Sequence, residues 1–251
     1  MTRLLLVICA LACMKCCTLT NRNGVNQEEA KPTTFLVKKC SEPPLINSVW
    51  DKEFWNNVLP VSLDNYMGEK PSHFPETNVK LKYDNHFIYV IFSVKDQYVK
   101  AVAKKRNGRV WDDSCVEFFF TPGPDVARGY FNFEANCKGV YLFQYHTDEG
   151  DNYGFVDDED CKEIIISHSL SKDVEEELIN PESWTLEYRI PISVLGKYME
   201  VDTPGPETIW RANFYKCADK SSHPHWLTWA HVKYPEPKFH LPEFFGQLEF
   251  E

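Results

Sequence analysis

The sequence contains none of the short signatures of the common hydrolases and nucleotide-binding proteins. It has no G-x-S-x-G elbow of serine hydrolases and no zinc-binding H-E-x-x-H pattern. Only eleven of its 251 residues are glycine, and none of them forms a glycine-rich loop of the kind that surrounds phosphates. These absences argue against a nucleophile-elbow hydrolase, a zincin protease and a P-loop nucleotide-binding protein.

Excess basic charge and long hydrophobic runs are also missing. The net charge is -10, which argues against a nucleic-acid partner because phosphate binding requires a basic face. Beyond the N-terminus, no stretch approaches the roughly 20 apolar residues that a membrane-spanning helix needs. We therefore expect neither a nucleic-acid partner nor a transmembrane segment.

The N-terminus has the pattern of an export signal. Arg3 precedes a short apolar run, and Ala10-Leu11-Ala12 has the small-x-small form after which signal peptidases cut. We predict an export signal over residues 1–17, with cleavage near 12/13. The same residues followed by Cys13 are related to a bacterial lipoprotein box, so a lipid anchor and simple cleavage both stay open. The predicted location is periplasmic, cell-surface lipoprotein or secreted.

The rest of the chain divides into a polar segment and one folded domain. Residues 18–39 are rich in polar side chains and predict a flexible tether. Residues 40–251 contain recurrent short runs with strand periodicity, separated by turn residues. These runs are 79–83, 86–95, 114–121, 130–136, 140–146, 164–170, 184–190, 209–216 and 246–250. They predict an all-β domain, an antiparallel immunoglobulin-like or jelly-roll-type β-sandwich of about ten strands.

One stretch combines an aromatic residue, acids and a strand. Residues 109–121 run R-V-W-D-D-S-C-V-E-F-F-F-T. Alternation in this strand points Val116, Phe118 and Phe120 one way and Glu117 the other way. A glutamate within so apolar a strand is costly to bury alone, so it either has a partner or faces a wet groove.

Five of the nine cysteines lie in the predicted domain: Cys40, Cys115, Cys137, Cys161 and Cys217. Five thiols cannot all pair within one chain. If residues 114–121 and 130–136 form a hairpin, Cys115 and Cys137 lie close together. They would then form either a disulfide or two buried free thiols.

Metal binding is weakly indicated. The acidic stretch 148–160 predicts either a calcium site or a solvated loop, and its spacing matches no EF-hand. His223, His225 and His231 lack a cysteine or carboxylate at ligand spacing and are better explained as polar loop residues. We predict no cofactor, with calcium as the open alternative.

Exposed tryptophans beside acids predict a sugar-binding surface. A pyranose has an apolar face of CH groups, on which an indole ring stacks, and a rim of hydroxyls that carboxylates bind. Trp111 and Glu117 provide this combination, and Trp226 and Trp229 provide further indole rings in a polar loop.

Four sequence blocks, in order, resemble the family 9-like carbohydrate-binding proteins of polysaccharide-using bacteria. They are R-V-W-D-D-S-C-V-E-F-F-F, G-Y-F-N-F-E-A-N-C-K-G, R-A-N-F-Y-K-C and P-E-P-K-F-H-L-P-E-F-F-G-Q-L-E-F. The resemblance covers most of residues 40–251. It implies a β-sandwich that binds sugar, often beside xylanases and related glycoside hydrolases.

The resemblance also implies roles for individual residues. Family 9 modules clamp a sugar between two tryptophans, with a glutamate in a W-x-x-x-x-x-E strand on its hydroxyls. Trp111 and Glu117 match that spacing, and Trp229 matches the second tryptophan. The family has an asparagine where this chain has Trp226. Asp112 and Asp113 match as structural acids at the start of the strand.

These observations predict non-catalytic binding of a neutral polysaccharide or oligosaccharide of the xylan or glucan type, in support of carbohydrate catabolism. Two alternatives stay open. A glycoside hydrolase would use two carboxylates, with Glu117 and Glu134 among the candidates. A haem-binding redox sandwich would need an axial histidine and either Met67 or Met199.

Overall fold

The computed structural model describes residues 32–147, 152–172 and 174–251. The predicted export signal, Cys13 and residues 18–31 of the predicted tether lie outside the described residues. In the part of the chain that is described, no helix is long and apolar enough to cross a membrane. The described residues form one compact unit.

Strands dominate this unit. The strands are β1 (Thr34–Lys39), β2 (Val61–Ser62), β3 (Asn65–Tyr66), β4 (Glu76–Tyr83), β5 (Phe87–Asp96), β6 (Cys115–Thr121), β7 (Tyr130–Asn136), β8 (Tyr141–His146), β9 (Tyr153–Phe155), β10 (Ile165–His168), β11 (Glu182–Pro191), β12 (Ile209–Cys217), β13 (Trp226–Thr228) and β14 (Gly246–Phe250). The helical pieces are short: α1 (Ile192–Leu195) and the 3-10 turns η1 (Glu53–Trp55), η2 (Val110–Asp112), η3 (Val126–Arg128), η4 (Asp160–Glu163) and η5 (Pro242–Phe244).

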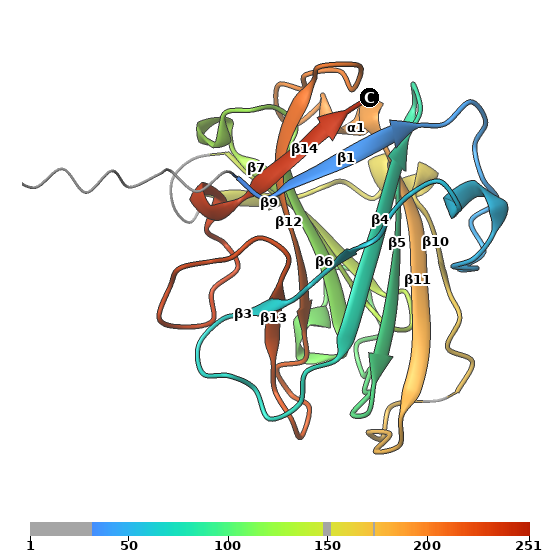
Figure 1. Cartoon of the computed structure of the whole chain (residues 1–251), viewed down its shortest axis with the longest axis vertical. Helices are drawn as coiled ribbons and strands as arrows, with labels where there is room; N and C mark the ends of the chain where they lie inside the picture. Colours follow the sequence, from blue (N-terminus) through green and yellow to red (C-terminus); the bar gives the residue numbers. More distant parts are fainter. Residues whose placement is uncertain (1–31, 148–151, 173) are drawn as a thin grey trace, which may run out of the picture. The chain divides into compact units, whose positions relative to one another are not determined.

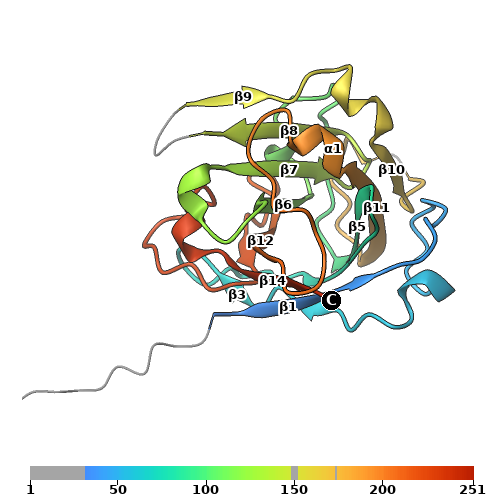
Figure 2. The ribbon, with the colours of Figure 1, turned by 90° about the horizontal axis from the view of Figure 1, so that it is seen from above.

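The strands form two layers that share β1. One layer runs β1-β14-β12-β6-β7-β8-β9, and the other runs β1-β4-β5-β11-β10. Figure 1 shows β1 between β14 and β4, and Figure 2 shows the first layer in succession from β9 to β1. The first four residues of β1 pair with β14 and its last two residues pair with β4. The predicted all-β sandwich is confirmed.

Two details of the predicted fold are wrong. The sheet is mixed, because β1 pairs in parallel with both β14 and β4. The predicted number of about ten strands agrees with the eleven in the main path of the sheet; in the described residues β2, β3 and β13 lie off this path and are too short to give a periodic signal. The folded unit also begins before Cys40. Residues 34–39, expected in the tether, form β1, with Phe35 and Val37 buried in the core.

Alternation along the strands of the first layer separates the core from a second, outer face. Val116, Phe118 and Phe120 of β6 point into the main core between the layers, as predicted. Glu117 and Phe119 lie on the opposite face. The chain after β13 returns over this outer face, where the Tyr215 hydroxyl donates to the Phe239 carbonyl (3.2 Å) and the two rings stack with centroids 4.1 Å apart.

Candidate functional site

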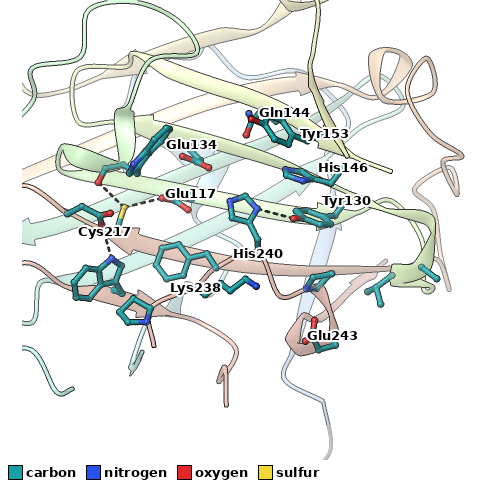
Figure 3. A pocket seen from close by; sticks show the side chains of 18 of the residues that line it. Glu117, Tyr130, Glu134, Gln144, His146, Tyr153, Cys217, Lys238, His240 and Glu243 are labelled. Carbon is teal, nitrogen blue, oxygen red and sulfur yellow. Dashed lines mark hydrogen bonds between the residues drawn. The ribbon is translucent and has the colours of Figure 1, made fainter. Parts of the chain in front are cut away.

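A cavity of about 1040 Å³ lies between the outer face of the β6-β7-β8-β12 region and the C-terminal segment that crosses it. Ligand pockets are typically about 300–1,000 Å³, so this one is large enough for more than one sugar ring. It is lined by Trp111, Glu117, Asp125, Val126, Ala127, Tyr130, Glu134, Gln144, His146, Tyr153, Cys217, Asp219, Trp226, Pro237, Lys238, Phe239, His240, Pro242 and Glu243. Figure 3 shows the polar members of this lining.

Two half-buried tryptophans, Trp111 and Trp226, line the cavity. Trp111 lies on η2, where the Arg109 guanidinium stacks over its ring at 5.1 Å. Trp226 begins β13 and donates from its indole nitrogen to Asp219 Oδ1 (2.8 Å). Both rings pack against the same small apolar cluster, which includes Cys217. This packing holds both indole rings in place, and each ring keeps part of its surface accessible to a ligand.

The structure corrects the predicted placement of Trp229. Its side chain is 6% exposed and belongs to the main core, where it packs against Phe35 and Phe214 with centroids 6.4 and 5.5 Å away. A Cβ at Gly246 would lie 2.8 Å from this indole, so the observed position of the Trp229 ring requires glycine at residue 246. Trp226 and Trp229 are three positions apart in an extended segment, so their side chains point to opposite faces. Trp226, not Trp229, therefore shares the cavity with Trp111.

Two buried carboxylates form the floor of the cavity. Glu117 on β6 and Glu134 on β7 are directly opposite each other in the strand register, and they are 2% and 4% exposed. Figure 3 shows them side by side. Glu134 Oε1 accepts from Asn132 Nδ2 (2.8 Å), whereas its Oε2 is buried without a hydrogen-bond partner among the described residues.

Burial raises the pKa values of both carboxyl groups. It raises the pKa of Glu117 well above its usual range, and the neighbouring Cys217 and Glu134 add to the rise. It raises the pKa of Glu134 to about 7, although the hydrogen bond from Asn132 opposes the rise. Two adjacent carboxylates cannot easily ionise together in a poorly solvated place. A ligand that donates hydrogen bonds would satisfy the oxygen that the protein leaves unpaired.

Aromatic and polar side chains extend the site along β7 and β8. The rings of Tyr130 and His146 stack with centroids 4.4 Å apart, and the Tyr130 hydroxyl lies 2.9 Å from His240 Nδ1. His146 Nε2 lies 3.0 Å from Asn132 Oδ1. Burial lowers the pKa of His146 to about 4, so this ring is neutral near pH 7. The cavity therefore offers flat rings and neutral polar groups beside its acids.

Asp112 and Asp113 are not part of the cavity lining. Asp113 is fully buried and accepts hydrogen bonds from the backbone nitrogens of Val102 (2.8 Å) and Ala103 (3.0 Å) and from Asn136 Nδ2 (2.8 Å). Asp112 accepts two hydrogen bonds from Arg109, whose guanidinium covers one face of Trp111. These acids thus fix the turn that carries Trp111.

The five cysteines of the described residues are buried free thiols. Of the two alternatives for Cys115 and Cys137, the structure shows the free thiols. In the register, Cys115 pairs with Cys217 on β12, and Asn136 occupies the position opposite it on β7.

The acidic stretch that could hold calcium is partly outside the described residues, which omit 148–151. Of its described members, Asp158 pairs with Arg106, and Asp160 pairs with Lys197 and accepts from the Tyr198 hydroxyl. Calcium binding here stays a prediction. For the haem alternative, the structure places Met67 and Met199 in packed apolar clusters outside the cavity lining.

Comparison with known proteins decides the family. The family model for carbohydrate-binding family 9 matches residues 52–250. The chain belongs to carbohydrate-binding family 9. A crystal structure from Bacteroides uniformis, described as that of a candidate carbohydrate-binding protein, shares 33% identity and a TM-score of 0.79. The match covers 88% of this chain and 100% of that one.

Family 9 modules with bound sugar have the same fold at lower identity. Two structures of a module from Caldicellulosiruptor kristjanssonii, one with glucose and one with cellotriose, share 18% identity and TM-scores of 0.57. The matches cover 87% of this chain and 96% and 94% of those chains. Among curated protein sequences no significant match is found.

The sequence does not by itself bring several of the site's residues together. Glu134 was a candidate by type only, and nothing in the sequence placed it beside Glu117. Cys217 and Asp219 come from the end of β12, about 100 residues after β6. Alternation along residues 130–136 does place Tyr130, Asn132 and Glu134 on one face, and that signal could have identified a polar wall.

Proposed function

We propose that this protein binds a neutral glycan of the xylan or glucan type without cleaving it. The observation that carries the proposal is that two half-buried tryptophans, Trp111 and Trp226, share one cavity with the buried carboxylates Glu117 and Glu134. Membership in carbohydrate-binding family 9 supports the same role. Indole rings would contact the apolar sugar face, and the carboxylates would accept from hydroxyls.

The placement of the two acids favours binding over hydrolysis. A glycosidase sets its carboxylates on either side of the scissile bond. Here Glu117 and Glu134 project from adjacent strands into the same floor. These two floor carboxylates thus lie on the same side of a bound sugar, which suits a hydroxyl rim.

The magnitude of the interaction fits a module that works beside other proteins. Covering one sugar between two indoles removes on the order of 150 Å² of apolar surface, or roughly 4 kcal/mol. The entropy of association offsets much of this gain. The expected dissociation constant is about millimolar to micromolar. We propose that the protein is exported and supports glycoside hydrolases that act on the same polysaccharide, a role that suits weak, multivalent binding.

Calorimetric titration with xylo- and cello-oligosaccharides tests the proposal. Trp111→Ala and Trp226→Ala each remove one stacking face, worth about 2 kcal/mol, so affinity should fall about 30-fold. Trp50→Phe, outside the cavity lining, is the matched control and should bind like the wild type. Wild-type protein that binds none of these sugars would refute the proposal, as would unchanged affinity in both alanine variants. A reducing-sugar assay separates binding from hydrolysis. A non-catalytic binder releases no reducing sugar, whereas a glycoside hydrolase releases sugar that is lost in Glu117→Gln or Glu134→Gln.

A further inference from the structure

A cluster of three side chains at the floor of the cavity includes two thiols to which the proposed sugar binding assigns no role. Cys115 on β6 and Cys217 on β12 are register partners on the outer face, and Glu117 lies two residues along β6 on the same face. Both sulfur atoms and a carboxylate oxygen lie within 4.8 Å of one another. Cys217 Sγ is 3.1 Å from Glu117 Oε1. All three side chains are buried.

We propose that Cys115, Glu117 and Cys217 form a three-ligand site for a zinc-class transition-metal ion, with the fourth position open to the cavity. Two thiolates and one carboxylate suit such a borderline-soft ion. Zinc bonds of about 2.3 Å to sulfur and 2.0–2.2 Å to oxygen place tetrahedral donors roughly 3.6–3.8 Å apart. The observed cluster needs only small side-chain movements to reach that spacing.

The surroundings of the cluster fit a bound cation. In the part of the chain that the structure describes, the hydrogen-bond partner of Glu117 is the Cys217 thiol, and no ion pair compensates the carboxylate. Glu134 lies opposite Glu117 with an unpaired oxygen, and Asp219 is also in the lining. A divalent ion would offset the negative charge of this concentration of buried acids.

The position of the cluster beside the cavity gives a metal ion a route to its ligands and leaves a fourth coordination position. Glu117 and Cys217 line the cavity, whereas Cys115 lies beneath them in an apolar cluster with Val110 and Leu142. An ion entering from the cavity would meet two of its ligands first. The position facing the cavity would take water. This inference does not rest on the proposed sugar binding, but it predicts that the two compete for Glu117.

Titration of the fully reduced, metal-free protein with Co²⁺ tests the site. We expect one Co²⁺ per chain, with thiolate-to-cobalt charge-transfer absorption that Zn²⁺ removes by displacement. Cys115→Ser and Cys217→Ser should each weaken the band, and Glu117→Gln should lower the affinity. Cys137→Ser, which changes a buried thiol of the main core, is the matched control and should keep the full band. Affinity should rise steeply with pH, because the ligand side chains must lose their protons on binding.

A second measurement guards against variants that fail to fold. Zn²⁺ should raise the unfolding temperature of the wild type and of Cys137→Ser, and should leave that of Cys217→Ser unchanged. Zn²⁺ should also weaken cellotriose binding by the wild type. Absence of the cobalt band in reduced protein would overturn the proposal, as would a band that persists in both serine variants. A Cys115–Cys217 disulfide that resists reduction would overturn it too. If the protein shows no cobalt band and binds sugar equally well with and without Zn²⁺, the metal site is refuted and the proposed function stands.

Discussion

The buried acid Glu134 should make the protein less stable as the pH rises through neutrality. The pKa of this side chain is raised from 4.5 to about 7 by burial. Between these two values the folded chain holds a proton that the unfolded chain has released. The free energy of unfolding therefore falls as the pH increases from about 4.5 to about 7 and levels off above it.

The size of this effect follows from the two pKa values. A difference of about 2.5 pH units at 1.36 kcal/mol each amounts to about 3 kcal/mol, most of it lost between pH 5 and pH 8. Glu134→Gln removes the charge and keeps a carbonyl oxygen for Asn132. We expect this variant to match the wild type at pH 5 and to be more stable at pH 8 by about 2–3 kcal/mol.

Urea unfolding at pH 5, 6, 7 and 8 gives the comparison. Glu53→Gln changes an exposed glutamate on η1 and serves as the control, with the pH dependence of the wild type. The charge of Glu134 helps to raise the pKa of the neighbouring Glu117, so the double variant Glu117→Gln/Glu134→Gln should flatten the profile further. If Glu134→Gln keeps the wild-type pH dependence, the reasoning about this buried acid is refuted.

Three further predictions concern the core, the buried ion pair and the ligand. Trp229→Ala should lower the free energy of unfolding by about 3–5 kcal/mol, because it empties a core site, and urea unfolding measures this. Lys216→Met should cost a similar amount, because it removes the buried ammonium 3.4 Å from Asp96 Oδ2 and leaves His73 as the remaining ion-pair partner of this buried acid. The double variant with Asp96→Asn should recover part of that loss; equal stability of the two variants would contradict this. Glycans that carry uronic acids should bind more weakly than neutral ones above pH 7, because the cavity is lined by several acids and one lysine; competitive calorimetry would show the difference.

Asp96 itself should show the opposite pH dependence to Glu134. Burial raises its pKa, but Lys216, His225 and His73 outweigh that effect and leave it lowered. An acid with a lowered pKa in the folded state contributes stability above its ordinary value near 3.8. This contribution is lost as the pH falls through the folded-state value. In one set of unfolding curves, the contribution of Glu134 to stability should thus change near neutral pH and that of Asp96 at acidic pH.

Local sequence was sufficient to assign the faces of the long strands. Strict alternation placed Phe118 and Phe120 in the core and Glu117 outside it, as the structure has them. Alternation could not choose between Trp226 and Trp229. Their spacing puts them on opposite faces, but the sequence does not say which face of so short a strand meets the core.

The sequence by itself determined the all-β class, the faces of β6 and the membership in carbohydrate-binding family 9. The tertiary structure alone decided which side chains meet in the cavity. Periodicity acts between neighbours along the chain, whereas strand pairing joins residues far apart in it. Only the pairing of β6 with β7 and β12 places Glu117 beside Glu134 and Cys115 beside Cys217.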